Sequence, residues 1–168
     1  MRIREESQMQ EFTLDSRWPE IEGALDSAKR LFLNSDQTLL EIDANERSLT
    51  HKFAEYLQPI FTSWNVDCEY NRNNGNSKRL HVLAPGCVST DDTDANTVYP
   101  DIIVHRRAST DNLLVIEAKK AGRDKSFDRL KLQAFLDRDG FGYIYAASLE
   151  FIVGKKCGIK IERVDANS

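Results

Sequence analysis

Three ionisable side chains lie within two apolar runs of this sequence. Residues 99–104 read Tyr-Pro-Asp-Ile-Ile-Val and contain Asp101, whereas residues 113–119 read Leu-Leu-Val-Ile-Glu-Ala-Lys and contain Glu117 and Lys119. Apolar runs of this length are typical of buried strands. An ionised side chain is costly in such a place unless it is paired or binds a metal. The three charges therefore need a chemical or structural reason to be there.

The spacing predicts that these charges meet. Side chains alternate between the two faces of a strand, so Glu117 and Lys119 share one face with Leu113. If residues 105–112 form a hairpin loop, the two runs pair as antiparallel strands. Asp101 then lies close to Glu117, and the two carboxylates face one cation.

Two converging carboxylates with a nearby lysine suit phosphodiester hydrolysis. Carboxylate oxygens are ligands for Mg²⁺, with Mn²⁺ as an alternative, and the Ala118 carbonyl is a candidate further ligand. A bound metal acidifies water and polarises a phosphate. Lys119 is then placed to orient the attacking water or to offset developing negative charge.

Pro100-Asp101 followed by Glu117-Ala118-Lys119 resembles the motif of the PD-(D/E)XK nuclease superfamily, in its uncharacterised prokaryotic or phage branch. The resemblance covers residues 45–150. It implies a restriction-endonuclease-like fold and a Mg²⁺-dependent endo- or exodeoxyribonuclease, with nucleic acid, preferably DNA, as the substrate. Asp101 and Glu117 would be the metal ligands and Lys119 a catalytic residue.

The resemblance also draws attention to two helices. Many members carry a further acid on the helix before the first strand, and Glu46 lies on the apolar stripe of such a predicted helix. Glu46 is thus a candidate accessory catalytic acid; the alternative is a capping box over residues 43–46. Lys131 and Gln133 lie on the helix after the Glu-x-Lys strand, where members place auxiliary polar residues.

The charge balance is less typical of a nucleic-acid-binding protein. The 168 residues carry a formal net charge of −4, whereas strong non-specific binding depends on phosphate neutralisation. Positive residues nevertheless gather near the proposed site, and the candidate nucleic-acid-binding residues are Arg72, Arg106, Lys120 and Lys131. The alternative for such clusters is an ordinary solvated loop.

Two alternatives to an active nuclease stay open. In the first, Asp101 caps the start of a strand and Glu117 forms a salt bridge with Lys119 or Lys120. In the second, the chain is a catalytically inactive nuclease-fold protein that binds nucleic acid or another protein. His105 shares the strand face of Asp101, where it is a candidate site residue or, alternatively, a structural one.

The order of predicted elements indicates a mixed α/β fold with a central sheet of four to five strands flanked by helices. We predict helices over residues 18–34, with Ser16 as N-cap, 43–61 and 126–138. We predict strands over 66–70, 99–104, 113–119, 143–149 and 159–164, a turn over 71–77 and a long connection over 78–98. Residues 1–17 are expected to be loosely held.

These predictions divide the chain into an N-terminal extension, residues 1–44, with one amphipathic helix, and a nuclease-like domain, residues 45–168. No run of eighteen apolar residues occurs, so we expect a cytoplasmic protein without membrane contact. The three cysteines lack the spacing of a disulfide framework or a zinc site. The resemblance leaves a homodimer open, since restriction-like enzymes that cut both strands often dimerise, but no coiled-coil heptad indicates an interface.

Overall fold

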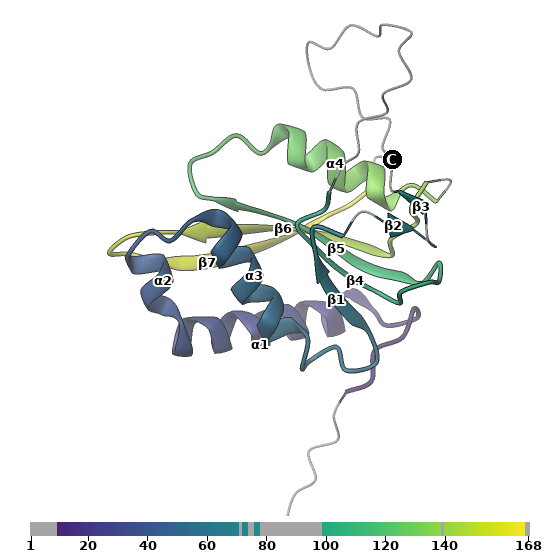
Figure 1. The fold of residues 1–168 in the computed structure, drawn as a ribbon, viewed down its shortest axis with the longest axis horizontal. Helices are drawn as coiled ribbons and strands as arrows, with labels where there is room; N and C mark the ends of the chain where they lie inside the picture. Colours follow the sequence, from purple (N-terminus) through teal and green to yellow (C-terminus); the bar gives the residue numbers. More distant parts are fainter. Residues whose placement is uncertain (1–9, 71, 74–75, 78–98, 139, 167–168) are drawn as a thin grey trace, which may run out of the picture.

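The computed structural model describes residues 10–70, 72–73, 76–77, 99–138 and 140–166 (Figure 1). Its helices are α1 (Trp18–Ser35), α2 (Gln37–Glu41), α3 (Glu46–Leu57) and α4 (Ser126–Leu136). Its strands are β1 (Asn65–Cys68), β2 (Arg72–Asn73), β3 (Asn76–Ser77), β4 (Ile102–His105), β5 (Asn112–Lys120), β6 (Tyr145–Ile152) and β7 (Gly158–Val164). The predicted connection over 78–98 lies outside the described residues.

Five strands form one mixed sheet in the order β1-β4-β5-β6-β7. Strands β1, β4 and β5 pair antiparallel, β6 runs parallel to β5, and β7 returns antiparallel to β6. Parallel neighbours need a crossover connection, which here contains α4. The predicted mixed α/β architecture, a sheet flanked by helices, is confirmed.

Helices α1 and α3 pack on one face of the sheet, and α4 covers the other (Figure 1). Apolar residues recur every three or four positions in α1, so Ile21, Leu25 and Phe32 are all buried. They join Phe53 of α3 and Phe151 of β6 in the larger of two cores. Helix α1 therefore shares its core with the sheet.

A smaller core lies between α4 and the opposite face of the sheet. Leu132 and Phe135 of α4 are fully buried there, together with Ile103 of β4 and Val115 of β5. Each of these two strand residues is two positions from an acid, Asp101 or Glu117, and so shares its strand face with that acid. Hydrophobic burial thus holds α4 directly beside the acidic residues.

The segment before α1 is packed more firmly than predicted. Phe12 is 3% exposed, and its carbonyl accepts a 2.8 Å hydrogen bond from the indole of Trp64. The prediction that residues 1–17 are loosely held is therefore wrong at the buried residues Phe12 and Ser16, while residues 1–9 lie outside the described residues. Ser16 as N-cap is also wrong, because Arg17 takes that position and the Ser16 hydroxyl accepts from the amide of the residue three positions earlier.

Local structure departs from the predictions in three further places. Within the described part of the predicted turn, residues 71–77, β2 and β3 pair antiparallel. Leu113 lies in the larger core and not on the face of Glu117, because the pairing of β4 with β5 shifts register between Val104 and His105. Helix α2 was not predicted, since five residues are too few to show a periodicity.

Among the helices of the described residues, none combines the length and apolar character needed to cross a bilayer. Cys68 and Cys157 are free thiols, and Cys87 lies outside the described residues. Burial raises the pKa of the Cys68 thiol to about 11. Cys68 therefore stays protonated near neutral pH and is a poor nucleophile.

Replacing Phe53 by alanine tests the larger core. The ring is fully buried between Phe32 and Phe151, so we expect Phe53→Ala to lower the free energy of unfolding by about 3–5 kcal/mol. Phe127→Ala is the matched control, because Phe127 is 37% exposed and its loss should cost about 1 kcal/mol or less. Urea unfolding measures both variants, and equal losses would contradict this description of the core.

Candidate functional site

The strands that carry Asp101 and Glu117 pair antiparallel, as predicted. Ile102 of β4 lies opposite Ile116 of β5, and one further step along each strand places Asp101 opposite Glu117. Neighbouring strands are about 4.8 Å apart. The two carboxylates therefore start from adjacent backbone positions on the face of the sheet that α4 covers.

Asp101 is held by the end of the neighbouring strand. Its Oδ2 accepts a 2.7 Å hydrogen bond from the backbone amide of Ala118. Burial raises the pKa of Asp101 above its ordinary value, although this hydrogen bond and the charge of Lys131 oppose the shift. This hydrogen bond is what the structural alternative predicts, in which Asp101 caps the start of a strand. It also fixes the carboxylate beside β5.

Glu117 is the most deeply buried carboxylate of this group, at 3% exposed. Its Oε2 accepts a 2.6 Å hydrogen bond from Nζ of Lys131 on α4, whereas its Oε1 is buried and has no hydrogen-bond partner within the described part of the chain. Burial raises the pKa of Glu117 well above its ordinary value, and the charge of Asp101 adds to the shift. A buried, unpartnered carboxylate oxygen is costly unless a cation or water satisfies it.

Lys119 follows Glu117 on the same face of β5 and also pairs with α4. Its Nζ lies 2.5 Å from Oδ2 of Asp128. Burial lowers the pKa of Lys119, but the hydrogen bond and charge of Asp128 outweigh it and leave the pKa above its ordinary value. Lys119 is therefore a cation at neutral pH.

Glu46 reaches the same end of β5 from the other side of the sheet. It is the first residue of α3, and its Oε2 accepts a 2.9 Å hydrogen bond from the amide of Lys120. The capping-box alternative is wrong, because Asn45 caps α3 by accepting from the Ser48 amide at 2.8 Å. The charge of Glu46 also raises the pKa of Asp101, which places Glu46 within electrostatic reach of that acid.

The salt bridges of the structural alternative are not formed. Glu117 pairs with Lys131, and neither Lys119 nor Lys120 is its partner. Lys120 turns to the α3 side, where its Nζ lies 2.6 Å from Oδ1 of Asp43. Both predicted nucleic-acid-binding lysines, Lys120 and Lys131, are thus near the acids, and each is already paired with a carboxylate.

Arg106 and His105 lie away from this site. Asp101 precedes β4, whereas His105 ends that strand and Arg106 follows it, so the prediction that Arg106 lies near the acids is wrong. The Arg106 guanidinium lies 4.5 Å from the ring centroid of Trp64 and pairs with Asp111 at 3.1 Å. Arg72 is the first residue of β2. Only its backbone is described, so its predicted role stays a prediction.

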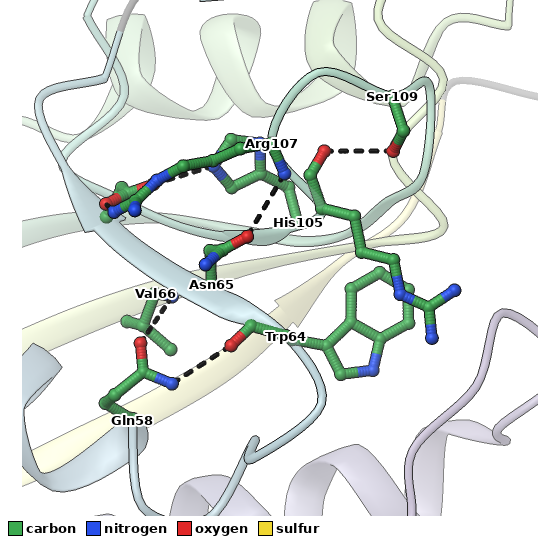
Figure 2. Close-up of polar contacts among 9 residues, drawn as sticks. Gln58, Trp64, Asn65, Val66, His105, Arg107 and Ser109 are labelled. Atoms are coloured by element: carbon green, nitrogen blue, oxygen red, sulfur yellow. Dashed lines mark hydrogen bonds and ion pairs between the residues drawn. The ribbon is translucent and has the colours of Figure 1, made fainter.

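The contacts around His105 hold β1 and the hairpin after β4 together (Figure 2). His105 Nε2 lies 2.8 Å from Oδ2 of Asp67, which also accepts from Arg107. Asn65 accepts a 3.1 Å hydrogen bond from the Arg107 amide, and Gln58 bonds the backbone on both sides of Asn65. His105 is 3% exposed. These contacts favour the structural alternative for His105.

Asp128 is the site residue that sequence reasoning missed. It lies in the first turn of α4, where an acid is most simply explained by the positive end of the helix dipole. The available signal was its spacing of three residues from Lys131, which places both on one helix face. That spacing indicates a shared face, but not the strand that the face meets.

The donor set fits a hard divalent cation in part. Asp101 and Glu117 bring carboxylate oxygens together, and a bound cation would satisfy the unpartnered Oε1 of Glu117. Within the described ranges, however, no three His, Cys, Asp or Glu side chains form a ready metal-binding group. Two protein ligands with water in the remaining positions is a usual arrangement for Mg²⁺.

Comparisons with protein-family models, with curated proteins and with solved structures found no match for this chain. The case for a function therefore depends on the geometry of the site.

The raised pKa of Glu117 predicts a pH-dependent stability. Because its folded-state pKa lies above the ordinary 4.5, the folded protein holds this proton to higher pH than the unfolded chain does, and stability falls as pH rises through that window. Glu117→Gln does not titrate. We expect its free energy of unfolding, relative to the parent protein, to increase from about pH 4.5 upward, as measured by urea unfolding across pH.

Glu162→Gln is the control for that measurement. The hydrogen bond and charge of Lys160 lower the pKa of Glu162, so its contribution is present above its unfolded pKa and is lost as pH falls. The Glu162 side chain is 52% exposed, which makes the effect small and opposite in sign. Identical pH profiles for Glu117→Gln and the parent protein would show that the folded protein does not raise the pKa of Glu117.

Proposed function

We propose that this protein is a Mg²⁺-dependent nuclease of the PD-(D/E)XK type that hydrolyses phosphodiester bonds, preferably in DNA. The observation that carries the proposal is the unpartnered, buried Oε1 of Glu117, opposite Asp101 and two residues before Lys119. A buried carboxylate oxygen without a hydrogen-bond partner is costly, and a cation bound there would satisfy it.

The arrangement of the elements supports the same proposal. Apart from the short strands β2 and β3, the chain from α3 to β6 runs helix, strand, strand, strand, helix, strand. The resemblance implies this order for a restriction-endonuclease-like core. The Pro-Asp segment directly precedes β4, and the Glu-x-Lys segment lies on β5, the strand next to β4 in the sheet.

Each residue has a role that its contacts allow. Asp101 and Glu117 would hold the metal, which supplies charge to polarise the scissile phosphate and acidify water. Lys119 is charged and lies on the Glu117 face of β5, so it can orient a nucleophile or offset charge on the phosphate. Glu46 positions the end of β5 through the Lys120 amide and adds negative charge beside Asp101.

One observation favours a second candidate, an inactive nuclease-fold module that binds nucleic acid or protein. The three lysines of the site are each paired with a carboxylate: Lys119 with Asp128, Lys120 with Asp43 and Lys131 with Glu117. In such a module these pairs would be permanent, and Lys131 would take the place of a metal. Metal binding separates the two candidates.

The proposal is tested with labelled single- and double-stranded DNA and RNA, incubated with Mg²⁺, Mn²⁺ or a chelator. We expect metal-dependent cleavage by the parent protein. Asp101→Asn, Glu117→Gln and Lys119→Met should each lower the rate by about 100-fold or more, because each removes a charge on which transition-state stabilisation depends. Circular dichroism should show that the variants remain folded.

Asp111→Asn and Lys160→Met are the matched controls. Asp111 pairs with Arg106 in the hairpin after β4, and Lys160 lies on β7 with its side chain 58% exposed. Both should cleave at the parent rate. Cleavage retained by both Asp101→Asn and Lys119→Met contradicts the assignment, and no cleavage of any substrate with either metal favours the inactive module.

A further inference from the structure

Helix α4 carries two oppositely charged side chains that pair crosswise with β5. Lys131 bonds Glu117 at 2.6 Å, and Asp128 bonds Lys119 at 2.5 Å. Helix residues three apart are neighbours, about 5–6 Å between their Cβ atoms, and strand residues two apart are separated by about 6.6 Å. The two spacings match, so one turn of α4 meets both charged positions of β5.

These pairs are shielded from water. The Glu117 and Lys131 side chains are 3% and 11% exposed, and those of Asp128 and Lys119 are 17% and 27% exposed. Just after Lys131, the fully buried Leu132 fixes the height of the helix above the sheet. Shielded pairs interact more strongly than surface pairs, so α4 controls the charge state of the site.

We propose that Asp128 and Lys131 form a latch, here called the α4 latch, that competes with the divalent cation: Lys131 satisfies Glu117 in the metal-free protein, and metal binding displaces it. This inference rests on the proposed metal site and adds how that site is regulated. In the same way, the ion pair with Asp128 holds Lys119 away from the substrate. Asp128 and Lys131 are positioning residues, since they act through Glu117 and Lys119.

The competition follows from charge and geometry. A divalent cation on Oε1 of Glu117 would share one carboxylate with the Lys131 ammonium on Oε2. Two cations on one carboxylate repel each other strongly in a site shielded from water. The coupling is also reciprocal, because an ammonium that weakens metal binding is itself weakened by the metal to the same extent.

Calorimetric titration of the full-length protein with Mn²⁺ tests the latch. Lys131→Gln retains an N–H donor for Glu117 but removes the charge, so we expect Mn²⁺ to bind more tightly, on the order of tenfold. Lys131→Arg retains the charge and should bind as the parent protein does. Arg129→Gln is the control, because it removes a positive charge from α4 at an exposed position with no ion pair to Glu117.

Hydrogen exchange of the parent protein gives a second readout that needs no variant. Mg²⁺ should speed exchange of the α4 amides near Lys131 and slow exchange at the end of β5. Slower exchange in both elements would overturn the latch, because the metal would then reinforce the Lys131–Glu117 pair instead of displacing it.

The outcomes separate this inference from the proposed function. If the parent protein binds Mn²⁺, Asp101→Asn abolishes binding and Lys131→Gln leaves the affinity unchanged or weaker, the metal site stands and the latch is wrong. If Lys131→Gln binds Mn²⁺ more tightly and Arg129→Gln does not, the latch is supported. If neither the parent protein nor Lys131→Gln binds Mn²⁺, both the metal site and the latch are rejected.

Discussion

The burial of the Glu117 carboxylate is the constraint on which the rest of the site depends. Strand β5 is central in the sheet and is covered on both faces, so the Glu117 carboxylate in it is buried away from bulk water. Lys131 must come from α4 to compensate that charge, and α4 is held there by Leu132 and Phe135. Hydrophobic packing of the smaller core thus decides where the compensating charge lies, and the charge in turn limits how α4 can shift.

The end of β5 is approached from both faces of the sheet. On one face, Glu46 at the start of α3 binds the Lys120 amide. On the other, Asp128 and Lys131 of α4 pair with the two charged residues of the strand. The helices belong to separate cores, so each is anchored independently of the other. Two rigid elements therefore fix one short stretch of strand, which suits a site in which carboxylates must be held close together.

The sequence allowed part of this arrangement to be predicted. The face on which a strand residue lies depends only on its position in the strand. The shared face of Glu117 and Lys119 and the approach of Asp101 could therefore be predicted. The charge partners could not, because the docking of α4 depends on packing between segments far apart in the chain. For that reason the sequence predicts Lys131 as a nucleic-acid-binding residue and does not indicate its partner Glu117. The predicted face of Leu113 was wrong because the strand pairing shifts register beside His105. Such a local irregularity cannot be inferred from the alternation of side chains along a strand.

The charge of the site matters more than that of the whole chain. The formal net charge of −4 argues weakly against binding a polyanion, but around the end of β5 the balance is local. Five acidic and three basic side chains lie around the end of that strand: Asp43, Glu46, Asp101, Glu117 and Asp128, with Lys119, Lys120 and Lys131. Burial raises the pKa of both Asp101 and Glu117, which reduces the negative charge that this group carries. On the proposed function, a divalent cation held by Asp101 and Glu117 would add positive charge where a phosphate approaches, so the local balance, more than the net charge of the chain, would decide whether a polyanion binds.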